Sequence, residues 1–331
     1  MNIKIRDVDR RIRDEINSII PDYVFDFHTH CFLDDGFDGC VPDSLKIYLP
    51  CDTESIFNKL RMFFPQRKLT GIITGWPDVR ADLIKQNDYI ACAAAKHNLF
   101  FLALISPRTD ISYIEQIVKK KECIGFKPYK CFAKNPEDAR ISDYVTQKQM
   151  EIANSFGLVI TLHLSKRSGI ADSVNIHDIL NLIEKFPFIR WNLAHCGRSF
   201  TPYYIEENVR GLEKLVRPNI YLDTSAVTDS EVFSLLFSIF GPNRIIYGSD
   251  APVSFLRGKC VAFGYDWAFI TEETHTITAS FPVSPTLILY EQLRAMKKAF
   301  KKSGFKKTDI KKVFFENAFD IVKDVMRRKN D

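Results

Sequence analysis

Residues that can bind a metal ion or transfer a proton recur in this sequence at the ends of short apolar runs. The first such run ends in His28-Thr29-His30, with two histidines two positions apart. Side chains alternate along a β-strand, so His28 and His30 would point to the same side of a strand. Two imidazoles placed in this way can hold one metal ion. Four later runs end at Lys127, His163, His195 and Asp250.

Each of these signals means little on its own. An H-x-H pair arises by chance, a lone histidine on a strand is often a core residue, and an aspartate at a strand end often caps the next turn or helix. Together they are more specific, because five of the eight predicted strands finish in such a residue, all at one end of the sheet. The other histidines, His97, His177 and His275, fall on predicted helices or in a loop.

The elements that must position these residues follow a regular rhythm. Short apolar runs rich in β-branched and aromatic residues alternate with longer helical patterns, as expected of parallel strands covered on both faces. The predicted strands are Tyr23–His28, Leu69–Thr74, Leu99–Ser106, Cys123–Lys127, Leu158–His163, Ile189–His195, Asn219–Thr224 and Arg244–Asp250. The predicted helices lie near residues 53–64, 78–97, 111–121, 142–156, 175–186, 203–216, 229–240 and 285–302.

Eight strands, each followed by a helix, predict an α/β fold of the (β/α)8 TIM barrel type. The main rival, an open doubly wound sheet, would need a glycine-rich phosphate loop after its first strand, and the sequence has none there. We expect a single domain over residues 1–331, with an N-terminal helix in 1–21, the barrel in 22–302 and a C-terminal helix in 303–331. The long connections 31–54 and 251–284 would overhang the C-terminal face of the barrel as binding loops or lids.

Composition and charge exclude several classes of protein. Hydrophobic residues make up 46% of the chain and charged residues 26%, which is ordinary for a globular protein and unlike a disordered one. No stretch reaches about 18 uncharged apolar residues, so no membrane-spanning helix is predicted. The net charge of +5 is mild and the basic residues are dispersed, so nucleic acid is not expected as a partner. Because the eight cysteines form no C-x-x-C pair and no signal peptide precedes them, we expect reduced thiols and a cytoplasmic protein.

The order H-x-H, Lys, His, His, Asp over eight strands resembles the amidohydrolase superfamily of metal-dependent hydrolases. More narrowly, the chain is similar to the amidohydrolase-2 branch, which includes non-oxidative decarboxylases of small unsaturated or aromatic acids. The similarity extends from about residue 22 to residue 322, and it says little about the first helix or the long connection after the eighth strand. The matching segments are DFHTH at 26–30, GFKPY at 125–129, TLHLS at 161–165, LAHCG at 193–197, YGSDAP at 247–252 and Glu316-Asn317-Ala318.

The resemblance implies one divalent metal ion, most simply zinc, because three nitrogens, one carboxylate and an open position are typical of a catalytic zinc site. The implied ligands are His28, His30, His163 and Asp250. His195 would be the acid–base or carbonyl-orienting histidine. In other branches the lysine of the fourth strand is carboxylated and bridges two metals, and Lys127 and His195 would then bind a second ion. We favour one metal, with Lys127 remaining a cation that holds the substrate.

Such a site can hydrolyse a carbonyl compound. Zinc can lower the pKa of its water from 15.7 towards about 7, and the resulting hydroxide would attack a carbonyl polarised by the metal or by His195. Asp250 would take the proton of the water and pass it to the leaving group. In a decarboxylase the same parts would protonate or add to a substrate carbon, while a cation orients the departing carboxylate.

Cations just beyond the strand ends suggest a small anionic substrate. Arginine binds carboxylate or phosphate in bidentate geometry, and Arg198, three residues after His195, is the strongest candidate. A salt bridge at the start of the next helix explains Arg198 equally well. The other predicted substrate contacts are Lys127, Tyr129, Trp76 and Arg257, with Lys130, Lys166 and Arg167 as weaker candidates.

Four functions follow from these residues, in decreasing order of support. The first is a metal-dependent hydrolase of a small amide, lactone or ester, and the second is a non-oxidative decarboxylase built on the same site. A phosphoesterase also begins with H-x-H but needs a late Asp-x-His, where this chain has Asp250 followed by Ala251. A non-catalytic binding barrel is the last, and the complete set of proposed ligands argues against it. Barrels of this kind are often dimers, so a homodimer is one assembly to consider.

Overall fold

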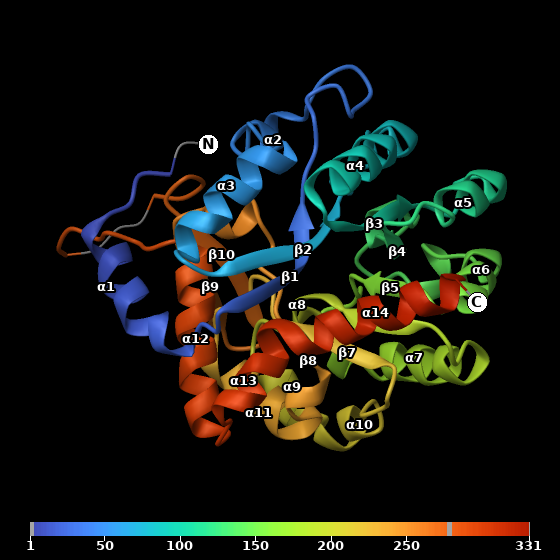
Figure 1. Ribbon diagram of the computed structural model, residues 1–331. Helices are drawn as coiled ribbons and strands as arrows, with labels where there is room; N and C mark the ends of the chain where they lie inside the picture. Colours follow the sequence, from blue (N-terminus) through green and yellow to red (C-terminus); the bar gives the residue numbers. More distant parts are fainter. Residues whose placement is uncertain (1–2, 277–279, 331) are drawn as a thin grey trace.

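The computed structural model describes residues 3–276 and 280–330. Over these residues eight parallel strands follow one another in chain order around one sheet (Figure 1). They are β1 Tyr23–His30, β2 Lys68–Thr74, β3 Phe100–Ile105, β4 Cys123–Pro128, β5 Val159–Leu162, β6 Arg190–Leu193, β7 Ile220–Asp223 and β8 Ile245–Ile246. Beyond β8, the N–H of Asp250 donates to the carbonyl of His28, and the N–H of His30 donates to that of Ala251. These bonds bring the end of the sheet back to β1, so the predicted barrel is confirmed.

Every predicted strand run overlaps one observed strand, and the largest difference in bounds is at β8. This strand ends at Ile246 rather than at Asp250. The N–H of Tyr247 donates to Val313, and Asp250 has a φ of 61°, so the chain leaves the regular ladder before it reaches the site residue. His163 and His195 likewise lie one and two residues beyond β5 and β6. His163, His195 and Asp250 therefore stand on the turns that follow the strands, whereas His28 and His30 lie at the end of β1 and Lys127 lies near the end of β4.

The strands are buried on both faces. Every residue of β4 and β5 is buried, as the apolar runs predicted. This is the pattern of a barrel whose interior is filled by side chains and whose exterior is covered by helices.

Five of the helices that surround the barrel begin at an aspartate cap. Asp52, Asp82, Asp110, Asp172 and Asp229 each accept a hydrogen bond from a backbone N–H in the first turn of the helix that follows. The helices between strands are α3 Thr53–Phe63, α4 Leu83–His97, α5 Ile111–Ile117, α6 Gln147–Phe156, α7 Ser173–Lys185, α9 Tyr203–Glu207, α10 Val209–Glu213 and α11 Ser230–Phe240.

One predicted helix is divided. The pattern over 203–216 forms α9 and α10, with a break at Asn208, whose φ of −130° is not helical. The side chain of Asn208 donates to the carbonyl of Ala171, 37 positions earlier in the chain, at 2.8 Å, so a tertiary contact accompanies the break. The sequence patterns do not predict the short helix α2 Asp43–Lys46 or the segment α8 Ala194–Arg198, which is a left-handed turn because residues 195–198 all have positive φ.

The connection after β8 is more regular than the sequence suggested. It contains an antiparallel hairpin of β9 Gly258–Phe263 and β10 Asp266–Thr271, joined at Gly264, which has a φ of 63°. In the predicted connection 251–284, residues 277–279 lie outside the described residues. The hairpin matters for function because it carries aromatic side chains towards the candidate site.

Helices at both ends of the chain pack onto the barrel, as predicted. At the N-terminus α1 Asp7–Ile16 contacts α12 Ile288–Lys302, where Glu15 pairs with Arg294 at 3.1 Å. At the C-terminus, α13 Lys307–Lys311 and a π-helical turn Lys312–Glu316 lead into α14 Asn317–Asn330 (Figure 1). Residues 1, 2 and 331 of the predicted terminal segments lie outside the described residues.

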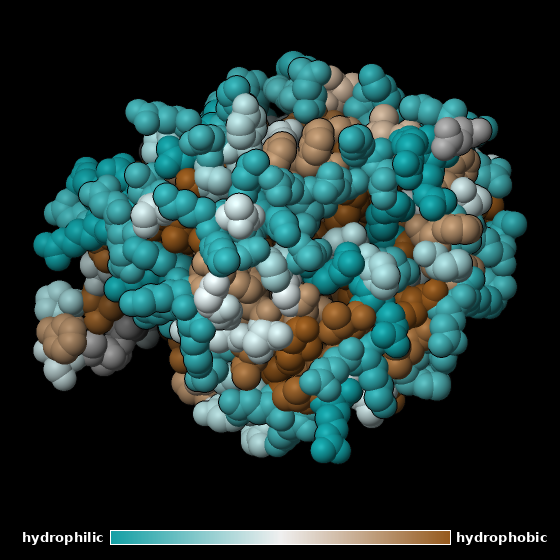
Figure 2. Space-filling view, turned by 60° about the horizontal axis from the view of Figure 1, so that its bottom comes forward, coloured by the Kyte–Doolittle hydropathy of each residue, from teal (hydrophilic) through white to brown (hydrophobic). Residues whose placement is uncertain are grey.

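The surface is mixed in character. Figure 2 shows a face that is mostly hydrophilic, with hydrophobic side chains gathered in a band across its middle. Each helix in residues 3–276 and 280–330 is too short or too polar to span a bilayer.

Candidate metal centre and active site

The two histidines of β1 form the centre of the candidate site. Both side chains are buried. The ring of His30 donates from Nδ1 to the carbonyl of Gly75 at 2.8 Å, and the ring of His28 contacts a carboxylate oxygen of Asp223 through Nδ1 at 3.1 Å. Since these partners accept hydrogen bonds, each Nδ1 carries the proton and each Nε2 carries a lone pair. The two Nε2 atoms lie only 3.2 Å apart.

Asp250 adds a third acceptor to this pair. Its Oδ1 lies 3.5 Å from Nε2 of His28 and 3.7 Å from Nε2 of His30. Three buried acceptors thus face one point, and a cation there would satisfy all of them. His28, His30 and Asp250 therefore form a group that could hold a metal ion.

Lys127 lies against this group from the end of β4. Its side chain is fully buried, and Nζ is 2.7 Å from Nε2 of His28. Burial lowers the pKa of Lys127 to about 8, against the opposing charges of Asp223 and Asp250. Burial also raises the pKa of Asp250 to about 8, although Lys127 counteracts this shift. A buried lysine with a lowered pKa beside a buried carboxyl group with a raised pKa is typical of sites with acid–base chemistry.

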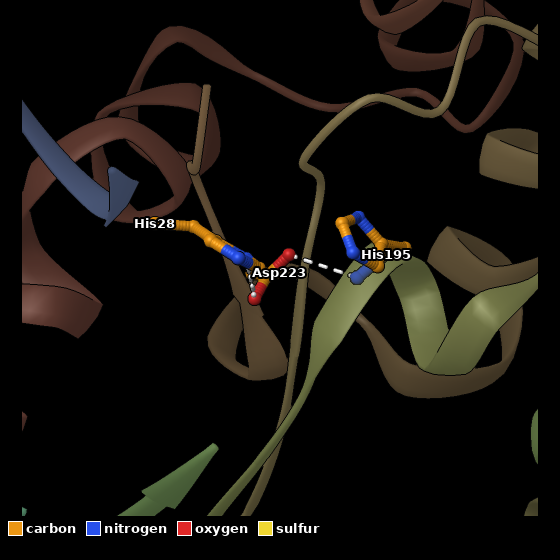
Figure 3. A group of neighbouring side chains, drawn as sticks. All are labelled: His28, His195 and Asp223. Carbon is orange, nitrogen blue, oxygen red and sulfur yellow. Dashed lines mark hydrogen bonds and ion pairs between the residues drawn. The ribbon is translucent and has the colours of Figure 1, made fainter. Parts of the chain in front are cut away.

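His195 approaches the same group from the turn after β6. It adopts a left-handed backbone conformation with a φ of 57°, and its N–H donates to Asp223 Oδ1 at 2.9 Å (Figure 3). Its Nδ1 donates to the carbonyl of Ser225 at 3.0 Å, which leaves Nε2 with a lone pair. Burial lowers the pKa of His195 to about 3, so the ring is neutral. The ring centroid is 5.0 Å from that of His28.

Asp223, at the end of β7, was not among the predicted site residues. With His28 and His195 it forms a second group that could hold a metal (Figure 3). However, its carboxylate already accepts hydrogen bonds from His28, from the N–H of His195 and from Asn192 at 2.8 Å. We therefore interpret Asp223 as a residue that orients two histidines, and the group of His28, His30 and Asp250 as the better metal candidate. Asp223 is the second-last residue of the predicted run 219–224. The search for acid–base residues at strand ends, which selected Asp250, could therefore have selected Asp223 too.

His163 lies beside the other histidines but belongs to neither three-residue group. Its ring centroid is 5.1 Å from that of His195 and 4.4 Å from that of Tyr129. Its Nδ1 is buried and has no hydrogen-bond partner among the described residues. Burial keeps the pKa of His163 well below its ordinary value. A neutral imidazole with an unpartnered nitrogen fits the chemistry of a metal ligand.

Aromatic side chains surround the histidines. The ring of Trp76 is centred 5.2 Å from that of His30. The ring of Phe200 is centred 5.8 Å from that of His195 and 4.3 Å from that of Trp267 of β10. Trp76 and Tyr129, both predicted substrate contacts, are thus brought beside the histidines, and the hairpin adds Trp267, which the sequence did not single out.

The two predicted arginines have different surroundings. Arg198 donates to the carbonyl of Lys166 at 2.6 Å, and its guanidinium lies 5.5 Å from the ring centre of Trp267. Arg257 instead binds Asp9 of α1, at 2.8 and 3.1 Å, and the carbonyl of Pro285. The structure therefore does not bring the Arg257 guanidinium into the histidine group, because an acidic residue of the N-terminal helix holds it. A partner 248 positions away could not be inferred from the local sequence.

The chain belongs to the amidohydrolase family, whose model Amidohydro_2 matches residues 25–321. This match confirms the resemblance drawn from the motifs. Members of the family are metal-dependent enzymes that act on small molecules. A search of the curated proteins found no match.

Solved structures share the fold. A dihydroxybenzoic acid decarboxylase from Polaromonas sp. JS666, with bound manganese and the inhibitor 2-nitroresorcinol, is 15% identical with a TM-score of 0.60, over 92% of this chain and 97% of that one. A 5-carboxyvanillate decarboxylase from Sphingomonas paucimobilis is 13% identical with a TM-score of 0.58, over 92% and 99%. A protein of Acinetobacter baumannii described as a probable 2-pyrone-4,6-dicarboxylic acid hydrolase, with citric acid bound, is 15% identical with a TM-score of 0.58, over 91% and 99%. The neighbours thus include proteins named for both reactions.

Proposed function

We propose that this protein is a metal-dependent hydrolase that cleaves an amide, lactone or ester bond in a small anionic substrate. The observation that carries the proposal is the convergence of the buried side chains of His28, His30 and Asp250 on one place at the C-terminal face of the barrel. We propose one zinc ion at this point, with His163 as the fourth ligand, because three imidazole nitrogens, one carboxylate and an open position are typical of catalytic zinc.

A bound divalent metal would supply a Lewis acid that polarises a carbonyl and acidifies water. The residues of the chain would do the rest. Asp250 lies beside His28 and His30, and in this proposal its carboxylate accepts a proton from water and returns it to the leaving group. His195, held neutral and fixed by Ser225 and Asp223, would direct its Nε2 towards the reacting carbonyl.

Decarboxylation is the second candidate, and Lys127 favours it. A buried ammonium group within reach of the metal ligands is suited to hold a carboxylate next to the reacting carbon. The same ammonium would serve a hydrolase by binding an anionic substituent. The two reactions differ in their product, because only decarboxylation releases CO₂.

Metal analysis and a product assay test this proposal together. Untagged protein purified without chelator should contain near one zinc per chain by elemental analysis. Near two would indicate a carboxylated Lys127 with His195 on a second ion. Carboxylate-bearing amides, lactones and esters would then be assayed for hydrolysis, and small carboxylic acids for CO₂ release. Protein that holds no metal and takes none up would contradict both reactions.

A further inference from the structure

Three cationic side chains gather where β4, β5 and β6 end. They are Lys130, Lys166 and Arg198, and their side chains are only 10, 12 and 10% exposed. Lys130 follows Tyr129, whose ring lies 4.4 Å from that of His163, and Arg198 follows His195 by three residues. Two of the three cations, Lys130 and Arg198, therefore lie close along the chain to residues of the candidate site.

The acidic partners of these cations are exposed. Glu137 contacts Lys130 at 2.6 Å and Arg198 at 3.4 Å, yet its own side chain is 73% exposed. Asp138 contacts Lys166 at 2.6 Å and is 74% exposed. Both acids lie on the connection between the short turns Lys130–Phe132 and Ile141–Asp143. Burying a cation costs free energy unless an anion compensates its charge. Here the compensating anions are the solvent-exposed carboxylates of Glu137 and Asp138.

Hydrogen bonds hold the backbone around the cluster, whereas the carboxylate of Glu137 is exposed to solvent. The carbonyl of Glu137 accepts a hydrogen bond from the N–H of Lys166 at 2.9 Å. Arg198 is held on one side by the carbonyl of Lys166 and stacked on Trp267. The cationic groups are therefore preorganised, and rotation of one exposed side chain would free both Lys130 and Arg198. A guanidinium beside an ammonium group is well suited to bind a carboxylate.

We propose that Lys130 and Arg198 form a carboxylate-binding subsite next to the metal centre, and that Glu137 occupies it until a carboxylate of the substrate displaces it. The assignment of that carboxylate to the substrate rests on the proposed function, whereas the subsite itself does not. Glu137 thus acts as an internal competitor that compensates the buried charges when no substrate is bound.

Two charge-removing variants test whether the carboxylate of Glu137 competes with a ligand carboxylate. Glu137→Gln and Asp138→Asn each remove one carboxylate of nearly equal exposure from the same connection. Isothermal titration calorimetry would measure the binding of malonate to wild type and variants that contain the same amount of metal. Neutral malonamide is the reference compound. We expect Glu137→Gln to bind malonate about tenfold more tightly, since a charged hydrogen-bonding competitor is removed. Asp138→Asn and malonamide binding should change less than about twofold. Equal effects of the two variants, or weaker binding in Glu137→Gln, would overturn the proposal.

Variants of the lysine test the subsite itself. Lys130→Met keeps the apolar stem and removes the charge, so malonate affinity should fall about tenfold, and Lys130→Arg should retain it. If malonate binds only to the metal, its affinity should be the same in wild type and in both Lys130 variants. That result would also overturn the proposal. Because binding is the readout, protein that binds malonate as expected but turns over no substrate would contradict the proposed function and leave the subsite standing.

Discussion

The Nε2 atoms of His28 and His30 lie 3.2 Å apart, and the Nδ1 atom of each ring contacts an acceptor. Two lone pairs at this distance repel each other unless a positive group lies between or beside them. Lys127 partly fulfils this need through its contact with His28. A divalent ion that also engages Asp250 would compensate the acceptors more completely.

Removal of one imidazole should therefore remove the metal without unfolding the barrel. His28→Ala should lose nearly all bound zinc, with a decrease in affinity larger than the about 10- to 100-fold typical of changes to residues that only orient ligands. Elemental analysis and thermal unfolding would measure the two effects. His177→Ala, on the exposed face of α7, is the matched control and should keep both metal and stability. Full metal content in His28→Ala would disprove the assignment.

Asp223 should control metal affinity without touching the ion. In Asp223→Asn the amide can present its N–H₂ to Nδ1 of His28, which would favour the wrong tautomer and turn the Nε2 lone pair into a donor. We expect metal affinity to fall about 10- to 100-fold, as measured by competition with a chelator. Asp229→Asn makes the same chemical change at the N-cap of α11, where either residue caps well, and should have no effect on affinity. Equal affinities in the two variants would exclude the orienting role of Asp223.

Asp250 should matter for turnover more than for folding. With metal supplied in excess, Asp250→Asn should lower kcat by about 10²- to 10⁴-fold, because a proton acceptor is replaced by an amide. Steady-state kinetics on the substrate found by the product assay would measure this. A variant that holds metal and retains the wild-type rate would remove Asp250 from the mechanism.

Short-range patterns were enough to predict the barrel. The alternation of buried strands and amphipathic helices depends on neighbouring residues, so all eight strands were found within a few positions. The residues at strand ends could be chosen because parallel strands bring those ends together. Thus His28, His30 and Asp250 could be grouped before any coordinates were known.

Contacts between distant segments could not be predicted in the same way. Arg257 resembled a substrate contact because a cation in a long loop has no local partner, and its actual partner is Asp9. The sequence analysis does not predict the hairpin of β9 and β10, because it treats residues 251–284 as one long connection. The role of Glu137 could not be predicted from the sequence, because an acidic residue in a polar loop is common. Only the folded structure places it in contact with Lys130 and Arg198.

The pair of Asp9 and Arg257 predicts how stability depends on pH. Burial alone would raise the pKa of Asp9, but hydrogen bonds from Arg257, from the N–H of Arg6 and from Thr286 outweigh it and hold the pKa below its ordinary 3.8. A carboxyl group with a lowered pKa in the folded state stabilises that state above the ordinary pKa of 3.8. This contribution is lost as the pH falls from 3.8 through the lower pKa of the folded state.

Asp9→Asn should therefore destabilise the protein at neutral pH and make little difference in strong acid. Breaking a buried ion pair costs about 3–5 kcal/mol of unfolding free energy, so a loss of about 3 kcal/mol is expected at pH 7. Urea unfolding of wild type and variant between pH 7 and pH 3 would show this difference shrinking only below pH 3.8. Asp7→Asn, which breaks the exposed pair with Arg10 on the same helix, should have almost no effect at any pH. A difference between Asp9→Asn and wild type that stays constant down to pH 3 would mean that the charge of Asp9 does not anchor α1 to Arg257.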